Sequence, residues 1–158
     1  MEIVRLREAE LEAFLTELWL PAKREMAATM TGYELDERDD VRETGRSHYR
    51  SRLADDETAT YVGREDGALV GYVSAELRGP APIFEAVREC HVSDLYVDPD
   101  TRRRGAGRAL LEAAEEWGRL HDCAHLDLNV DADNEGALAL YEAAGLNAER
   151  YQMQKSLD

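Results

Sequence analysis

The alternation of hydrophobic and polar positions divides the first third of the chain into a strand and two helices. Residues 2–7 alternate apolar and polar side chains, as a half-buried strand does. Residues 8–30 repeat apolar side chains at helical spacing, and Pro21 is expected to break or kink that helix. A polar loop over 31–40 leads to a second helical pattern over 41–53.

The period then changes from that of helices to that of strands. Residues 58–79 read as two strands joined by the dipeptide Asp66-Gly67, a strong hairpin signal. Two prolines mark 79–89 as a loop, and 90–97 reads as the next strand.

The last third alternates helices and strands. A helix is predicted over 105–120, a strand over 124–130 and a short helix over 134–144 that Gly145 ends. A final strand is expected within 146–157. The order is strand, two helices, three strands, helix, strand, helix, strand, so the 158 residues predict one mixed α/β domain.

Charge excludes some partners. The chain carries 34 acidic against 19 basic side chains, a formal net charge of −15, and its only lysines are Lys23 and Lys155. Phosphates are repelled by most of such a surface, so neither nucleic acid nor an anionic membrane is an expected partner. An acid-rich, lysine-poor composition suits a salt-rich cytoplasm, and a salt-adapted (halophilic) source is our hypothesis.

The sequence shows no membrane span, no signal peptide and no metal-ligand spacing. No apolar run approaches the roughly 20 residues of a membrane span, and the N-terminal residues do not resemble a signal peptide. We therefore expect a cytoplasmic protein. Cys90 and Cys123 match no metal spacing and are expected to be buried, reduced thiols. His48, His121 and His125 also lack ligand spacing, so no metal site is predicted.

Four arginines crowd around two glycines after the strand over 90–97. They are Arg102, Arg103, Arg104 and Arg108, with Gly105 and Gly107 between them. A helix start presents unpaired N–H groups and partial positive charge, and glycines let a ligand approach the backbone. The pattern indicates a phosphate site. The alternative is an ordinary helix start with solvated arginines.

Two common nucleotide motifs fit this turn poorly. No Lys-Ser or Lys-Thr follows the glycines, as a P-loop requires. Leu110 stands where the dinucleotide fingerprint needs glycine or alanine, although Asp127 lies at the spacing of its ribose-binding acid.

The segment Arg102 to Gly107, Arg-x-x-Gly-x-Gly, resembles the signature of the GNAT superfamily of N-acetyltransferases. A second element, 134-NEGALALYEAAGL-146, is similar to the family's Asn-x-x-Ala…Tyr-Glu-x-x-Gly-Phe pattern, with Leu146 in place of the phenylalanine. The resemblance covers the element order of the whole chain. It implies a GNAT fold with a splayed central sheet and acetyl-coenzyme A as co-substrate.

The resemblance also implies the residues that contact coenzyme A. Backbone N–H groups from Arg103 through Ala106 to Arg108 would hold the pyrophosphate, with the arginines facing its charge. The backbone of Leu95, Tyr96 and Val97 would pair with the pantetheine arm and contact the thioester carbonyl. Asn134 and Ala137 would complete the cofactor contacts, Asn134 also as a helix cap.

Two catalytic roles follow from the same resemblance. Tyr141 matches the tyrosine that protonates the departing sulfur; the alternative is an aromatic core residue. His91 lies near the position of a strand-borne base, and histidine has an apt unperturbed pKa of roughly 6.5. By alternation His91 shares a face with Leu95 unless a bulge intervenes. Asp94 or Glu85 as base, or water alone, stay open.

The acceptor is expected to be an amine gripped by the first two helices, their loop and the last strand. Trp19, Tyr33 and Tyr49 lie there, together with acids, which are Glu34, Asp36, Glu37, Asp39 and Asp40. An acidic mouth would favour a cationic amine, whereas salt adaptation explains the same acids. Asp127 and Asn129 are expected to line a polar cleft. A coenzyme-binding sensor without turnover is the alternative function, and a homodimer is compatible with the family.

Overall fold

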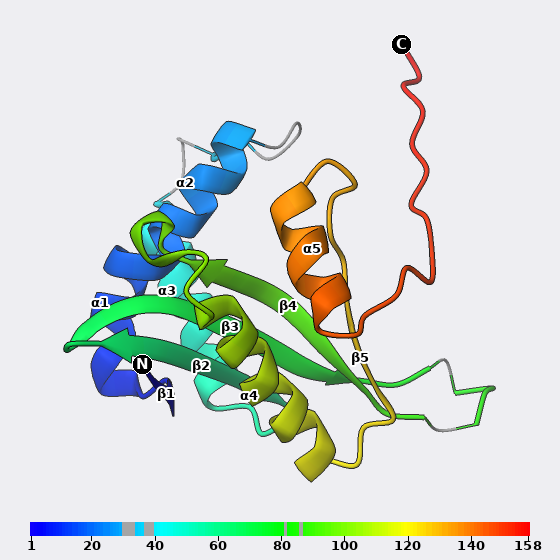
Figure 1. Ribbon diagram of the computed structural model, residues 1–158, viewed down its shortest axis with the longest axis horizontal. Helices are drawn as coiled ribbons and strands as arrows, with labels where there is room; N and C mark the ends of the chain where they lie inside the picture. Colours follow the sequence, from blue (N-terminus) through cyan, green and yellow to red (C-terminus); the bar gives the residue numbers. More distant parts are fainter. Residues whose placement is uncertain (30–33, 37–39, 81, 86) are drawn as a thin grey trace.

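The strands form one mixed sheet. The computed structural model describes residues 1–29, 34–36, 40–80, 82–85 and 87–158. Within these ranges the strands, in sheet order, are β1 (Glu2–Arg5), β2 (Thr58–Glu65), β3 (Ala68–Arg78), β4 (Glu89–Val97) and β5 (His125–Leu128). Neighbours from β1 to β4 are antiparallel, and β4 and β5 are parallel. The mixed α/β class is confirmed (Figure 1).

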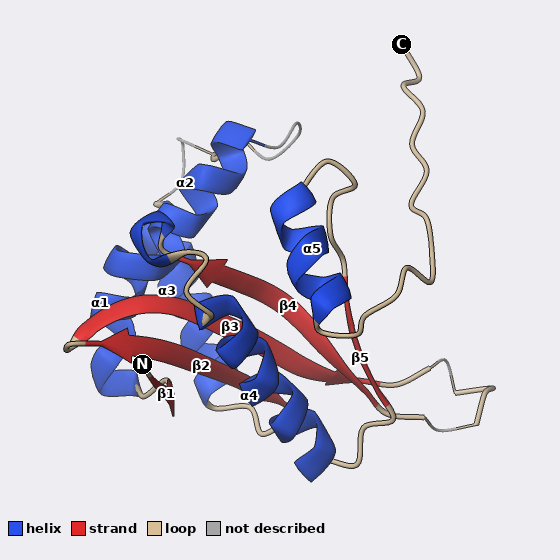
Figure 2. Cartoon of the chain, in the orientation of Figure 1, coloured by secondary structure: helices blue, strands red, loops and turns tan. Residues whose placement is uncertain are grey.

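Helices cover both faces of the sheet (Figure 2). One face carries α1 (Leu11–Phe14), a π-helical turn (Leu15–Trp19), α2 (Leu20–Thr29) and α3 (Val41–Leu53). The other face carries α4 (Ala106–Leu120) and α5 (Glu135–Ala143). Short 3₁₀ turns, Glu8–Glu10 and Pro99–Thr101, precede α1 and follow β4. No helix in the described ranges is long and apolar enough to span a bilayer.

Each face has its own apolar core. On the α1–α3 face, the Phe14 ring meets Tyr49 and Tyr72 edge to face, with centroids 4.7 and 4.9 Å apart. On the α4 face, the buried residues include Leu110, Leu111, Ala114 and Trp117. The sheet is therefore covered on both sides, which explains why buried positions follow one another in β2 and β3 without alternation.

The helix that carries Pro21 does not end there. Helical structure continues from Leu11 to Thr29, and Pro21 occupies the first turn of α2, directly after the π-helical turn. The π-helical turn directly before Pro21 widens the helix, which makes room for the proline ring without ending the helix. The helix does not break at Pro21, although it changes from π-helical to α-helical geometry directly before this residue.

The strand expected within 146–157 is absent. Residues 146–158 form neither helix nor strand and lead away from the rest of the molecule (Figure 1). The strand over 124–130 is also shorter than predicted, since β5 covers only His125–Leu128.

Candidate active site

The turn before α4 presents a row of unpaired backbone donors. Gly105, with φ 89°, precedes the helix, and Arg103 also has a positive φ, 63°. Within the described residues, the N–H groups of Arg103 to Arg108 have no hydrogen-bond acceptor, whereas Ala109 N–H donates to the Gly105 carbonyl. Successive N–H groups in such a turn form a concavity that binds anions. Ala106 and Gly107 lie inside this row.

Arg102 is tied to neighbouring elements by hydrogen bonds and an ion pair. Its Nη2 donates to both Glu25 oxygens, at 2.8 and 2.7 Å, and its Nε donates to the Val97 carbonyl at 2.8 Å. The guanidinium carbon also lies 5.7 Å from the Tyr96 ring centroid. Glu25 belongs to α2, so this ion pair joins the turn before α4 to the helices on the other face of the sheet.

The other arginines of the cluster differ in their contacts. Arg104 lies 3.5 Å from a Glu65 oxygen. Arg108 donates to Glu112 at 3.0 Å and to the Ala143 carbonyl at 2.8 Å, which joins α4 to the end of α5. Arg103 is exposed. The predicted cluster therefore surrounds the turn, with several of its charges balanced by the protein's own acids.

The edge of β4 toward β5 is paired over only half of its length. Glu89 to Val92 pair with β5, and the rest of β4 continues past the end of that strand. Leu95, Tyr96 and Val97 pair with β3 on their other side. The two parallel strands therefore leave a free backbone edge that runs toward the unpaired N–H groups, as the splayed sheet predicts (Figure 2).

Helix α5 borders the same free edge. The Asn134 side chain caps it by accepting the Ala137 N–H at 3.1 Å. Leu140 packs so closely on Gly107 that a Cβ there would lie 3.0 Å from it. Tyr141 is partly buried against the α4-side core, and burial, with the Asp94 carboxylate as a smaller cause, raises the pKa of its phenol to about 12. The phenol is therefore a protonated donor at neutral pH.

His91 is buried beside β5. Only 5% of it is exposed, and its Nδ1 lies 3.2 Å from both carboxylate oxygens of Asp127. His91 is paired with Glu76 of β3, and Asp94 with Ser74, two residues earlier. Since positions two apart share a face, His91 and Asp94 lie on the same side of the sheet.

A bulge at Ser93 causes this arrangement. Val92 pairs with Ala75 and Asp94 with Ser74, so Ser93 is an extra residue in β4. His91 consequently does not share the face of Leu95, which packs in the α4-side core. The bulge turns Asp94 toward α2, where its carboxylate accepts hydrogen bonds from Tyr72 Oη at 2.5 Å and Lys23 Nζ at 2.7 Å.

Asp94 borders a cavity of about 300 Å³ between the first helices and the sheet. Its lining residues come from α2, α3, β3, β4 and the π-helical turn; they are Trp19, Lys23, His48, Tyr49, Arg52, Glu76, Ser93 and Asp94. Burial, followed by the nearby Arg52 and Lys23 charges, holds the pKa of His48 below its usual value. In this lining the positive charges of Lys23 and Arg52 equal in number the negative charges of Glu76 and Asp94.

Sequence reasoning missed several of these groups. Asp94 was a candidate base, but its contact with Lys23, 71 positions away, was not predicted. Tyr72 was not predicted either, because in the sequence it is only an apolar position of a strand. Trp19 and Lys23, four positions apart on a helix, were an available signal, and the ammonium lies 6.0 Å from the indole centroid. Trp19 and Tyr49 were both expected near the acceptor.

The expected acidic mouth falls partly outside the described residues, which exclude Tyr33, Glu37 and Asp39. Glu34 is exposed, and the Asp40 carboxylate caps α3 by accepting the Arg42 and Glu43 N–H groups. Glu85 is exposed in the loop before β4. Among the described acids, Glu34, Asp40 and Glu85 do not line the 300 Å³ cavity.

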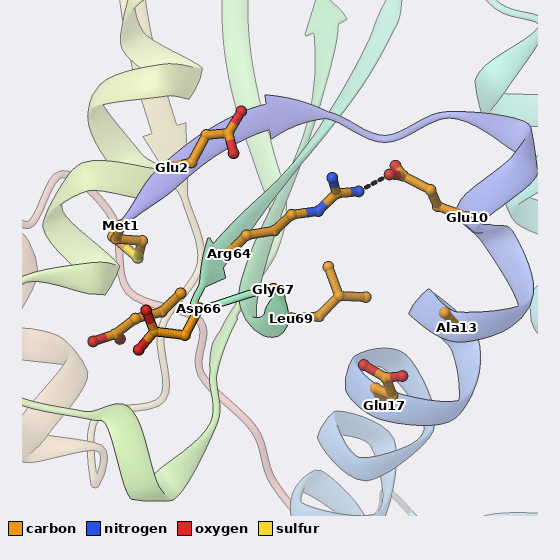
Figure 3. Close-up of a pocket in the computed structure, with 10 residues that line it drawn as sticks. Met1, Glu2, Glu10, Ala13, Glu17, Arg64, Asp66, Gly67 and Leu69 are labelled. Atoms are coloured by element: carbon orange, nitrogen blue, oxygen red, sulfur yellow. Dashed lines mark ion pairs between the residues drawn. The ribbon is translucent and has the colours of Figure 1, made fainter.

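A larger concavity, about 740 Å³, lies beside the N-terminus and the β2–β3 turn (Figure 3). Acids predominate among its charged side chains, and Arg64 is ion-paired with Glu10 across it. It contains none of the residues predicted for catalysis or coenzyme binding. The smaller cavity beside Asp94 is therefore our candidate acceptor site.

The described residues contain no group of three His, Cys, Asp or Glu side chains that could hold a metal ion. Cys90 and Cys123 are free thiols; Cys90 is buried, as expected, and Cys123 is partly exposed. Burial raises the pKa of Cys90 to about 12.

Residues 13–146 match the family model described as "Acetyltransferase (GNAT) family". Among relatives by sequence, the chain is 40% identical over 86 residues to the N-alpha-acetyltransferase RimI of Mycobacterium tuberculosis, covering 54% of this chain and 50% of that protein. Alignments with two uncharacterised N-acetyltransferases, from Methanocaldococcus jannaschii and Bacillus subtilis, cover 44% and 63% of those proteins. The chain thus spans about half the length of these relatives.

Solved structures share the fold over nearly the whole chain. A mutant of the BH1408 protein from Bacillus halodurans superposes with a TM-score of 0.85 at 19% identity, covering 99% of both chains. The aminoglycoside acetyltransferase AAC(6')-Iy, solved with a bisubstrate analogue of coenzyme A and acetylneamine, superposes with a TM-score of 0.75 at 18% identity, covering 98% and 97%. With the family model matched over most of its length, this chain belongs to the GNAT family of acetyltransferases.

Proposed function

We propose that the chain is a single acetyltransferase domain that moves an acetyl group from acetyl-coenzyme A to a primary amine. The observation that carries the proposal is the row of unpaired N–H groups from Arg103 to Arg108, which continues the unpaired edge of β4. These donors suit an anionic, extended ligand such as coenzyme A. The coenzyme A analogue bound by AAC(6')-Iy, a protein of the same fold, supports this ligand class.

Coenzyme A would lie along the splay between β4 and β5. The turn donors and the adjacent Arg103 would face its pyrophosphate, and exchange of the Glu25 or Glu112 contacts would free Arg102 or Arg108 for the same charge. Backbone groups of Leu95, Tyr96 and Val97 would pair with the pantetheine arm. Asn134, whose oxygen is engaged in the helix cap, retains its amide NH₂ as a further donor.

The reaction needs three groups around the thioester. The neutral amine forms the new N–C bond while the C–S bond breaks, and a backbone N–H of β4 stabilises the charge on the carbonyl oxygen. Tyr141, which burial keeps protonated, donates its phenolic proton to the departing thiolate, and the phenolate regains a proton from solvent as coenzyme A leaves. The amine proton passes to a base on the acceptor side.

We assign the base to Asp94, directly or through water. Asp94 lines the cavity, whereas His91 is almost fully buried and its Nδ1 is engaged by Asp127. The Tyr72 hydroxyl and the Lys23 ammonium hold the Asp94 carboxylate in place.

The acceptor is proposed as an amine of moderate charge, because the cavity balances Lys23 and Arg52 against Glu76 and Asp94. The two acceptor classes to compare are peptide N-termini, suggested by RimI, and aminoglycosides, suggested by AAC(6')-Iy. Amino acids and polyamines complete the set.

The test is release of coenzyme A thiol from acetyl-coenzyme A with each acceptor class, together with calorimetric binding of acetyl-coenzyme A. We expect binding in the absence of acceptor and turnover with one class. Binding without turnover for every acceptor would favour the sensor function instead. Absence of binding would show that the turn before α4 is not a coenzyme A site.

A further inference from the structure

The charges that line the acceptor cavity of about 300 Å³ are equal in number but unequally paired. The Asp94 carboxylate is held by the Lys23 ammonium at 2.7 Å and by the Tyr72 hydroxyl at 2.5 Å. The Glu76 carboxylate lies 2.5 Å from Nη2 of Arg78, a residue outside the lining of the cavity. Each carboxylate therefore has a close cation without using the second cation of the lining.

That second cation is Arg52, in the last turn of α3. Only 9% of its side chain is exposed, and its Nη1 lies 3.9 Å from a Glu76 oxygen. Its Nη2 donates to the Ala75 carbonyl at 2.9 Å. Its buried Nε–H meets no acceptor in the part of the chain that the structure describes. Because a buried charge is costly unless a counter-ion or hydrogen bonds compensate it, this guanidinium is an incompletely paired cation at the cavity.

His48 indicates the sign of the potential at this end of the cavity. It lies one turn before Arg52, on the same side of α3. After burial, the charges of Arg52 and Lys23 are the largest causes of the lowered pKa of His48. The two carboxylates of the lining act in the opposite direction and more weakly. The end of the cavity beside α3 is therefore positive and favours an anionic group of a ligand.

The base and the incompletely paired cation lie near each other in one small cavity. Arg52 contacts the carbonyl of Ala75, and Asp94 pairs with Ser74, the preceding residue of β3. A volume of about 300 Å³ is at the lower limit of ligand pockets and suits one small molecule. A single small acceptor can therefore place its amine at Asp94 and an anionic group beside the guanidinium.

We propose that the acceptor is a small amine that also carries a carboxylate, chemically an amino acid, and that Arg52 binds this carboxylate. The inference rests on the proposed acetyl transfer and adds the acceptor class to it. A carboxylate can accept two parallel N–H bonds from a guanidinium, and it would provide the counter-charge that Glu76 provides only from 3.9 Å.

The same charge selects against other amines. The amino nitrogen forms the N–C bond to the acetyl group, its proton passes to Asp94, and coenzyme A leaves as the thiol. A polycationic amine, such as an aminoglycoside, would bring a positive group to Arg52 instead of a counter-ion. A neutral amine would leave the guanidinium incompletely paired.

The first experiment compares amino acids with their own carboxamides, which keep the amine and the side chain but lack the carboxylate. Release of coenzyme A thiol is measured at saturating acetyl-coenzyme A, and rates are expressed per neutral amine because amidation lowers the pKa of the amine. We expect kcat/KM of the best amino acid to exceed that of its carboxamide by about 30-fold or more, the effect of losing hydrogen bonds to a charged group. Equal values would overturn the proposal.

The second experiment replaces the cation. Arg52→Gln should lower kcat/KM for the amino acid by about 30-fold, mainly through KM, and change that for the carboxamide by less than about threefold. The matched control is Arg50→Gln, an exposed position of the same helix, which should change neither value. Equal losses with both substrates would show that Arg52 only holds α3 on the sheet and would overturn the proposal. If Arg52→Gln does not fold, the comparison of acid with amide in the native protein decides.

Failure of this inference can be distinguished from failure of the proposed reaction. Turnover of peptide N-termini, aminoglycosides or carboxamides in preference to every amino acid would overturn the role of Arg52 and leave acetyl transfer standing. Absence of acetyl-coenzyme A binding in calorimetry would overturn both.

Discussion

At the scale of single residues, the position of Asp94 depends on one extra residue in β4. Regular alternation would place Asp94 on the face opposite to His91, and the bulge at Ser93 brings both to the same side. Of the two, Asp94 reaches the cavity.

We predict that Asp94→Asn lowers kcat/KM by about 100-fold, because an amide cannot accept the amine proton. His91→Asn is the comparison and should retain kcat/KM within about tenfold, with a lower melting temperature because His91 is buried. Steady-state kinetics of both variants decide between the two bases. A larger loss in His91→Asn would transfer the role to that histidine, and small losses in both would leave proton removal to water.

Tyr141→Phe removes only the phenolic hydroxyl. We predict a loss in kcat of about 10² to 10⁴ with little change in acetyl-coenzyme A affinity, since the ring still packs. Because burial raises the pKa of Tyr141 to about 12, the native phenol keeps its proton up to pH 10 or beyond. The tyrosine should therefore cause no fall in native kcat between pH 8 and 10. An unchanged kcat in the variant would show that Tyr141 is a packing residue.

At the scale of elements, the packing of α3 on the π-helical turn shapes the acceptor cavity. Helix α3 is held against the first helical layer where Gly45 meets Trp19; a Cβ at Gly45 would lie 2.5 to 2.9 Å from the indole ring. Trp19 also lines the acceptor cavity. The packing of α3 against Trp19 therefore fixes one wall of the acceptor cavity.

Gly45→Ala is predicted to lower the free energy of unfolding by about 1–3 kcal/mol, since a buried clash exceeds the gain in helix propensity. The matched control is Gly136→Ala in α5, where a Cβ meets nothing within 4 Å. That substitution should raise the free energy of unfolding by about 0.5–1 kcal/mol. Urea denaturation measures both values. A stabilised Gly45→Ala protein would contradict the close packing of α3 on Trp19.

At the scale of the whole molecule, self-repulsion follows from 34 acids against 19 bases. We predict that the melting temperature rises between 0.05 and 1 M KCl, because salt screens that repulsion over a Debye length that falls from above 10 Å to about 3 Å. Surface ion pairs such as Arg46 with Glu12 weaken over the same range, but each contributes little. A melting temperature that falls with salt would contradict a net repulsive surface.

Local patterns in the sequence determined most elements of this protein. Apolar spacing located α3 and α4, the Asp66-Gly67 dipeptide located the β2–β3 turn, and Asn134 and Gly145 bounded α5. The anion-binding turn before α4 could also be predicted from the sequence, because it consists of consecutive backbone N–H groups and two glycines. Such features depend on neighbours a few positions apart, so the sequence alone contains them.

Only the tertiary structure decided which distant groups meet. The bulge at Ser93, the Asp94 contacts with Lys23 and Tyr72, and the Arg102–Glu25 ion pair join residues from separate elements. The last segment shows the same limit: a strand was expected within residues 146–157, yet these residues pair with no strand of the sheet. Periodicity specifies which face of a segment is apolar, but the packed molecule decides what that face contacts.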